Sequence, residues 1–114
     1  MSNLVCDLSS KNCKPCEGGV PALGEVEAEE MLNQLEGWTL DGGRIWKKYT
    51  FKNYYRTMAF VNALAWISHS EEHHPDLEVC WGHCTVTYST HAINGLSEND
   101  FICAAKCDAL FKLR

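Results

Sequence analysis

Three histidines occupy positions where ordered elements are expected to end. His73 and His74 stand directly before Pro75, which is expected to end a long helical pattern, and His91 closes a later strand pattern. The ordinary pKa of imidazole lies near neutrality, so a histidine can donate or accept a proton at cellular pH. These residue types at these positions predict acid–base chemistry.

The expected topology brings the histidines together. The strand that begins after Pro75 and the strand that ends at Thr90 are expected to pair antiparallel, so the end of the second returns to the start of the first. His91, expected on the polar face of its strand, would then lie close to the two adjacent histidines. Asp100, at the start of the next helix, would lie close behind.

Each of these residues also has a structural explanation. A histidine at the C-terminal end of a helix interacts favourably with the helix dipole. Asp100 stands three residues after Ser97, in the form of a capping box. His69 and His83 are expected on solvated surface, and Trp81 in the core. Convergence of three histidines at one end of a sheet favours a site over these separate explanations.

A metal site is the alternative use of the same helix end. His69 and His73 are four residues apart on one helical face, which is plausible spacing for zinc ligands. The pattern lacks the internal glutamate of the zincin motif, and Pro75 ends the helix at the second ligand. We therefore predict no metal at this site.

The cysteines indicate free thiols. Their odd number, seven, argues against a disulfide framework. Cys13 and Cys16 have the spacing of zinc ligands or a redox pair, but no second pair follows at the distance of a zinc ribbon. We interpret this segment as a thiol-bearing arm. Cys103 and Cys107 lie one helical turn apart, which packing explains.

Composition excludes several classes of partner. The 114 residues carry a net charge of -5, with no Lys/Arg run longer than Lys47-Lys48, which argues against nucleic acid or a membrane surface. No apolar run is long enough to span a bilayer, and the first residues lack the pattern of a signal peptide. A cytoplasmic location is expected.

Apolar periodicity predicts an α+β fold in the order α-β-β-α-β-β-α. Helices are expected over 26–35, 53–71 and 98–113, and strands over 38–40, 45–51, 77–81 and 84–90. The result would be a four-stranded antiparallel sheet with three helices packed on one face. Residues 1–24, rich in proline and glycine, are expected to be a flexible arm before one domain at 25–114. The helix over 53–71 is apolar almost all round, which predicts a homodimer or homotetramer.

The spacing of these residues resembles the pterin-4a-carbinolamine dehydratases, bacterial branch. The signature is His73-His74-Pro75, Trp81 six residues later, His91 ten after that, and Asp100 nine further. The Cys13-x-x-Cys16 arm is similar too. The resemblance implies a carbon–oxygen lyase that dehydrates 4a-hydroxytetrahydrobiopterin to quinonoid dihydrobiopterin, in tetrahydrobiopterin recycling.

The reaction suits these residues. A proton must reach the leaving hydroxyl and another must leave ring N5, and neither step needs a metal or an organic cofactor. We expect His73 and His91 to be the acid–base pair, His74 to orient the pterin, and Asp100 to orient a histidine or hold its charge. The cavity is further expected to be lined by Glu72, Ser89 and Thr90. The alternative is a non-enzymatic oligomeric binding or coactivator module that uses the helix over 53–71.

Overall fold

The computed structural model describes residues 8–15 and 21–113, and its elements follow the expected order. The helices are α1 (Glu25–Leu32), α2 (Tyr54–Glu71) and α3 (Glu98–Lys112); the strands are β1 (Thr39–Asp41), β2 (Arg44–Thr50), β3 (Asp76–Val79) and β4 (His83–Tyr88). Two 3-10 turns are η1 (Leu8–Ser10) and η2 (His91–Ile93). Within these residues, no helix is long and apolar enough to cross a membrane.

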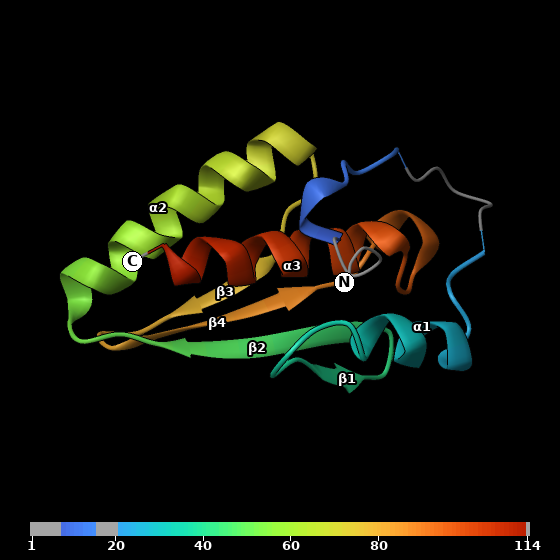
Figure 1. The fold of residues 1–114 in the computed structure, drawn as a ribbon, viewed down its shortest axis with the longest axis horizontal. Helices are drawn as coiled ribbons and strands as arrows, with labels where there is room; N and C mark the ends of the chain where they lie inside the picture. Colours follow the sequence, from blue (N-terminus) through green and yellow to red (C-terminus); the bar gives the residue numbers. More distant parts are fainter. Residues whose placement is uncertain (1–7, 16–20, 114) are drawn as a thin grey trace.

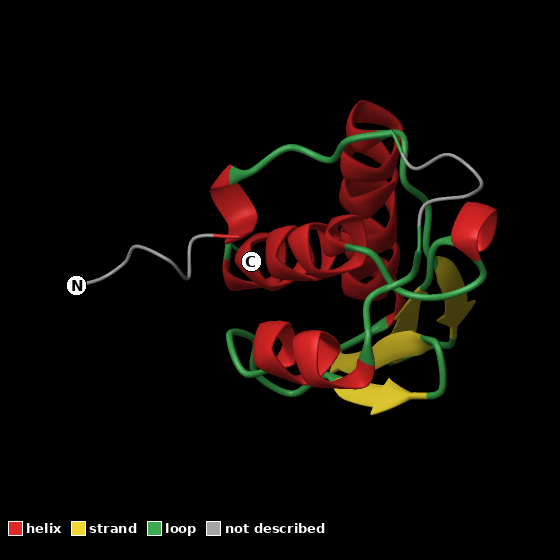
Figure 2. Cartoon of the chain, turned by 90° about the vertical axis from the view of Figure 1, so that its right-hand side faces the viewer, coloured by secondary structure: helices red, strands yellow, loops and turns green. Residues whose placement is uncertain are grey.

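The strands form one antiparallel sheet in the order β1-β2-β4-β3, and the helices cover one of its faces (Figures 1 and 2). On the covered face, Ile45 lies opposite Tyr88 and Tyr49 lies opposite Cys84, and all four side chains are almost fully buried. This alternation is the strand period of two that the sequence displays. The predicted α+β class is confirmed.

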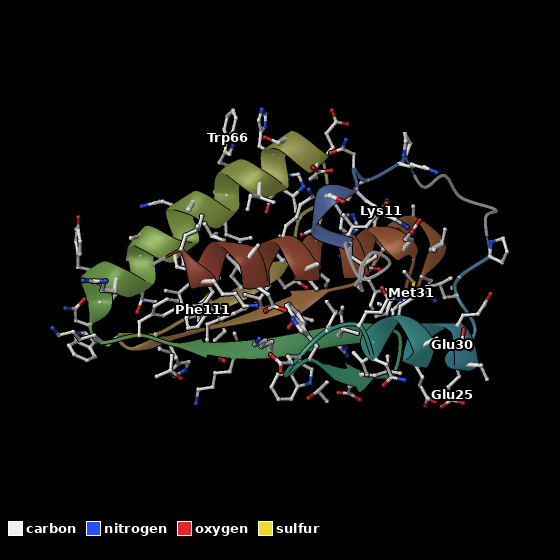
Figure 3. All side chains as sticks on the ribbon, viewed as in Figure 1. Lys11, Glu25, Glu30, Met31, Trp66 and Phe111 are labelled. Carbon is white, nitrogen blue, oxygen red and sulfur yellow. The ribbon has the colours of Figure 1, made fainter. Side chains whose placement is uncertain are left out.

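Helix α2 buries only one of its sides. Its cap is Asn53, whose side chain accepts a hydrogen bond from the Arg56 N–H at 2.9 Å. The buried side chains lie three or four residues apart on one line: Thr57, Phe60, Leu64 and Ser68. On the outer side, Trp66 points away from the fold with 70% of its surface exposed (Figure 3), and Tyr55 is 79% exposed. The second apolar side expected from the sequence is therefore open to solvent in the single chain.

The β3–β4 hairpin corrects one prediction. Strand β3 ends at Val79, because the chain turns back where the Cys80 N–H donates to the His83 carbonyl at 2.8 Å. Trp81 lies in this turn with 66% of its surface exposed. The prediction that Trp81 belongs to the core is wrong.

The end of β4 corrects a second prediction. The strand ends at Tyr88, not Thr90, since Thr90 pairs with Gly95 in an isolated bridge that closes a short loop. His91 begins η2 inside that loop, so it does not share the polar face of the strand. Helix α1 is also shorter than predicted, because it ends at Leu32 and residues 33–37 turn the chain into β1.

Part of the segment before α1 packs against α3. Leu8 in η1 is 2% exposed and belongs to the hydrophobic core. The Lys106 ammonium donates to the Ser9 carbonyl at 2.8 Å, and Lys11 forms a salt bridge with Glu98 at 2.9 Å. No sequence pattern predicted these contacts.

Candidate functional site

Helix α2 ends in a turn that carries the chain toward the sheet. Glu72 adopts a left-handed conformation (φ 53°), and its N–H donates to the His69 carbonyl at 3.2 Å. The His73 N–H donates to the Ser68 carbonyl at 3.1 Å. These two bonds satisfy carbonyls at the helix end as a Schellman motif does, and Pro75 prevents the helix from continuing.

The His73 ring rests on β4. It stacks on the Tyr88 ring with 6° between the planes and 5.8 Å between the centroids, and its side chain is 11% exposed. Burial raises the pKa of Tyr88, whose hydroxyl lies 3.5 Å from Cys107 Sγ. The phenol therefore stays neutral, and His73 has a rigid, uncharged support.

A buried carboxylate holds one nitrogen of His73. His73 Nε2 lies 2.6 Å from Asp100 Oδ1, and Asp100 is fully buried. The other oxygen, Oδ2, accepts from Thr90 Oγ1 at 2.8 Å and from the Ser97 N–H at 3.0 Å. A carboxylate that acts as the acceptor in this contact requires the proton of the neutral imidazole on Nε2. Nδ1 is left as the nitrogen through which His73 can exchange a proton with a bound molecule.

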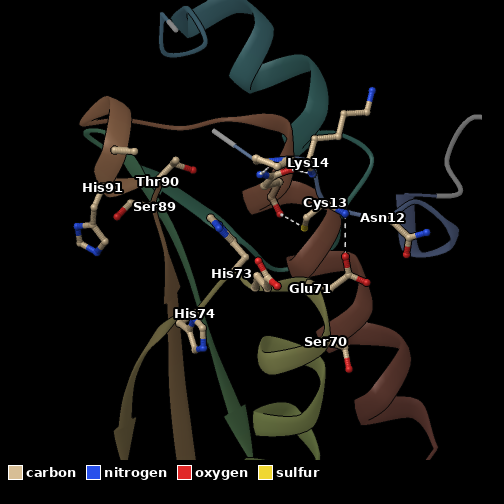
Figure 4. A pocket seen from close by; sticks show the side chains of 14 residues that line it. Asn12, Cys13, Lys14, Ser70, Glu71, His73, His74, Ser89, Thr90 and His91 are labelled. Atoms are coloured by element: carbon tan, nitrogen blue, oxygen red, sulfur yellow. Dashed lines mark hydrogen bonds between the residues drawn. The ribbon is translucent and has the colours of Figure 1, made fainter. Parts of the chain in front are cut away.

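A cavity of about 470 Å³ opens beside this pair (Figure 4). All the residues predicted to contact the substrate line it: Glu72, His73, His74, Ser89, Thr90 and His91. Asp100 does not line the cavity itself, but it bonds to two residues that do, His73 and Thr90. The structure thus brings the predicted site residues together, while their individual roles stay predictions.

The lining residues differ in how far a ligand could reach them. His74 and His91 are exposed, whereas Thr90 is 4% exposed. The Thr90 hydroxyl is also occupied, since it lies 2.8 Å from both Ser97 Oγ and Asp100 Oδ2. Thr90 is therefore better placed to position Asp100 than to bind a ligand.

Another wall of the cavity comes from the segment interpreted as an arm. Residues 12–15 line it, together with Glu71 and Asn99. The Cys13 N–H donates to Glu71 Oε1 at 2.7 Å (Figure 4). The only sequence signal was the Cys13-x-x-Cys16 spacing, and Cys16 lies outside the described residues.

The donor set suits proton transfer. Among residues 8–15 and 21–113, no group of three or more His, Cys, Asp or Glu is placed to hold a metal ion. The zinc site weighed as an alternative would need His69 and His73. His73 Nε2 instead bonds to Asp100, and the His69 ring lies beside the Trp66 ring, with 6.3 Å between their centroids. The cavity instead presents imidazoles and the carboxylates of Glu71 and Glu72, which are the usual groups of general acid–base catalysis.

Comparison with known proteins supports the resemblance seen in the sequence. A family model described as Pterin 4 alpha carbinolamine dehydratase matches residues 21–110. A Nitrosomonas europaea protein, provisionally named a pterin-4-alpha-carbinolamine dehydratase, is 64% identical over 109 residues, which cover 95% of this chain and 96% of the relative. A crystal structure of a transcriptional coactivator/pterin dehydratase from Brucella melitensis has a TM-score of 0.75 and 31% identity, covering 78% of this chain and 97% of that one. A pterin dehydratase-like RuBisCO assembly factor of the alpha-carboxysome has a TM-score of 0.55 and 25% identity, covering 65% of this chain and 86% of that one. The chain belongs to the pterin-4-alpha-carbinolamine dehydratase family.

Proposed function

We propose that this protein is a lyase that dehydrates 4a-hydroxytetrahydrobiopterin to quinonoid dihydrobiopterin by histidine acid–base catalysis. The observation that carries the proposal is the 2.6 Å contact between His73 Nε2 and Asp100 Oδ1, in a cavity that His74 and His91 also line. Tetrahydrobiopterin recycling in the cytoplasm is the setting that this reaction suits.

The dehydration moves two protons. One imidazole donates a proton to the hydroxyl at C4a, which leaves as water, and another imidazole accepts the proton from N5 as the N5–C4a double bond forms. We assign these roles to His73 and His91. A carboxylate bonded to one imidazole nitrogen fixes the tautomer and stabilises the imidazolium when it forms, which is the role we give Asp100.

The remaining residues of the cavity would hold the pterin. His74 is exposed next to His73 in the chain, and Glu72 and Ser89 add a carboxylate and a hydroxyl to the lining. These groups suit the hydrogen-bonding edge of a flat pterin ring. The two proton transfers proposed above use neither an organic cofactor nor a metal.

The test is direct observation of the reaction. Purified protein added to freshly generated 4a-hydroxytetrahydrobiopterin should make the carbinolamine absorbance disappear faster than it does spontaneously. A rate equal to the spontaneous one, measured with folded protein, would refute the proposal.

A second candidate function is an oligomeric binding module built on α2. The observation that favours it is the exposed aromatic side of that helix, with Trp66 at 70% and Tyr55 at 79% exposed. The first partner we propose is another copy of the chain, giving a homodimer or homotetramer. Sedimentation at micromolar concentration should show an oligomer, and Trp66→Glu should shift it toward monomer; a strictly monomeric wild-type profile would contradict the proposal.

A further inference from the structure

Two thiols meet where the N-terminal segment crosses α3. Cys13 Sγ lies 3.4 Å from Cys103 Sγ, although the residues are 90 positions apart in the chain. We propose that Cys13 and Cys103 are a reversible disulfide site that fixes residues 8–15, here called the arm wall, against α3. This inference does not depend on the dehydratase activity.

Hydrogen bonds to two helices fix the backbone at Cys13 and at Lys14, and they keep the Cys13 thiol close to Cys103. The Cys13 N–H donates to Glu71 Oε1 at 2.7 Å. Next to it, Asn99 Oδ1 accepts from the Lys14 N–H at 3.0 Å, and Asn99 Nδ2 donates to the Lys14 carbonyl at 2.5 Å. Asn99 and Cys103 are four residues apart on α3, hence on one face of that helix. The same helical face therefore binds the backbone of the arm wall and presents the second thiol.

The approach needed for a bond is small. A disulfide joins its sulfurs at about 2.05 Å, so the 3.4 Å separation must close by roughly 1.4 Å. Cys13 lies on a loop, which can supply that shift more readily than Cys103 on its helix.

The two thiols differ in solvent exposure, and we therefore expect the more exposed thiol to react first with an oxidant. Cys13 is half-buried and lines the cavity, whereas Cys103 is fully buried. With hydrogen peroxide as the oxidant, the Cys13 thiolate attacks one oxygen, so that an S–O bond forms and the O–O bond breaks. The products are a sulfenic acid and hydroxide, and the hydroxide takes up the proton that the thiol had released and becomes water. The Cys103 sulfur then attacks the Cys13 sulfur, the S–S bond forms, and the S–O bond breaks with release of a second water. The two sulfurs lose two electrons in total, and the peroxide gains them.

Protonation controls the rate of this oxidation. The hydrogen bond to Cys103, together with burial, raises the pKa of Cys13. Because the thiolate is the reactive form, the pair should oxidise slowly near neutral pH and faster as the pH rises.

The disulfide would change the cavity wall and the stability of the fold. Residues 12–15 line the cavity, where hydrogen bonds to Glu71 and Asn99 hold the backbone of Cys13 and Lys14. A bond between residues 90 positions apart closes a long loop, which lowers the entropy of the unfolded chain. The oxidised protein should therefore melt at a higher temperature, by on the order of ten degrees.

The experiment treats the reduced full-length chain with hydrogen peroxide at pH 8.5 and then blocks the remaining thiols. Trypsin, which does not cut between Lys14 and Pro15, should yield a cross-link between peptides 12–44 and 57–106 that dithiothreitol removes. Cys13→Ser and Cys103→Ala should each abolish the cross-link and the rise in melting temperature.

Cys16→Ser is the matched control, since it removes the neighbouring thiol of the same peptide and should leave both readouts unchanged. A cross-link confined to peptide 12–44 would mean a Cys13–Cys16 bond and would overturn the proposal. So would a cross-link that survives in Cys103→Ala, or wild-type protein that forms no intramolecular disulfide.

Discussion

Replacing Asp100 by asparagine tests whether the buried carboxylate serves the chemistry. The amide keeps the size of the side chain, but it offers only one oxygen to the three donors of Asp100: His73 Nε2, Thr90 Oγ1 and the Ser97 N–H. If the amide nitrogen faces His73, Nε2 must become the acceptor and the proton must move to Nδ1. The nitrogen toward the cavity would then be in the wrong form to accept a proton.

The expected loss follows from the bond that is removed. A hydrogen bond to a charged group contributes roughly 1.5–3 kcal/mol, and each 1.4 kcal/mol is about tenfold in rate. Asp100→Asn should therefore lower kcat by roughly 10- to 150-fold. Steady-state kinetics with 4a-hydroxytetrahydrobiopterin measures this loss, and nitrogen NMR of His73 reports the change of tautomer.

Asp108→Asn is the matched control, because Asp108 is also a carboxylate on α3 with three donors. It accepts from Trp38 Nε1 at 3.1 Å, Lys47 Nζ at 2.8 Å and Tyr49 OH at 2.5 Å, and it does not line the histidine cavity. Both variants should lose roughly 1–3 kcal/mol of stability, but only Asp100→Asn should lose turnover. Wild-type kcat in folded Asp100→Asn, or an equal loss in Asp108→Asn, would refute the reasoning.

Three further outcomes are expected. Glu72→Gly should stabilise the fold by roughly 1 kcal/mol, because glycine adopts the left-handed conformation (φ 53°) without strain; a lower melting temperature would contradict this. Chelators should leave dehydratase activity unchanged, since proton transfer needs no Lewis acid, whereas activity lost with bound zinc and restored by it would contradict the mechanism. Burial raises the pKa of Cys84 to about 11 and that of Cys107 to about 12 from an ordinary value of 9.0. The unfolded chain releases these protons first, so the free energy of unfolding should fall as pH rises above 9, by up to about 1.4 kcal/mol per pH unit for each thiol; Cys107→Ala should reduce that slope, and denaturant titrations between pH 8 and 11 measure it.

The sequence predicted the elements because each carries a local signal. Asn53 caps α2, Ser97 caps α3, and Pro75 prevents α2 from continuing. Antiparallel pairing of β3 and β4 then placed His91 near His73, and that prediction survived even though β4 ends two residues early. The shift does not separate the histidines, because the start of β3 and the end of β4 still lie side by side in the sheet.

Contacts between distant segments could not be predicted. Trp81 was expected in the core because it continues the alternation of β3, but alternation does not show where a turn begins. The bond between Asp100 and Thr90 depends on a loop closed by the Thr90–Gly95 bridge, and the contact of Cys13 with Cys103 joins residues 90 positions apart. No pattern within one element carries that information.

The most direct test of the central claim is the steady-state turnover of His73→Ala and His91→Ala on 4a-hydroxytetrahydrobiopterin. General acid–base groups contribute on the order of 10²–10⁴ in rate, so each variant should lose kcat by that order, and the double variant should lose less than the product of the two losses. His74→Ala should act more on KM, and His83→Ala, at the far end of β4 opposite Thr50, should keep wild-type turnover. Wild-type kcat in both His73→Ala and His91→Ala would contradict the account.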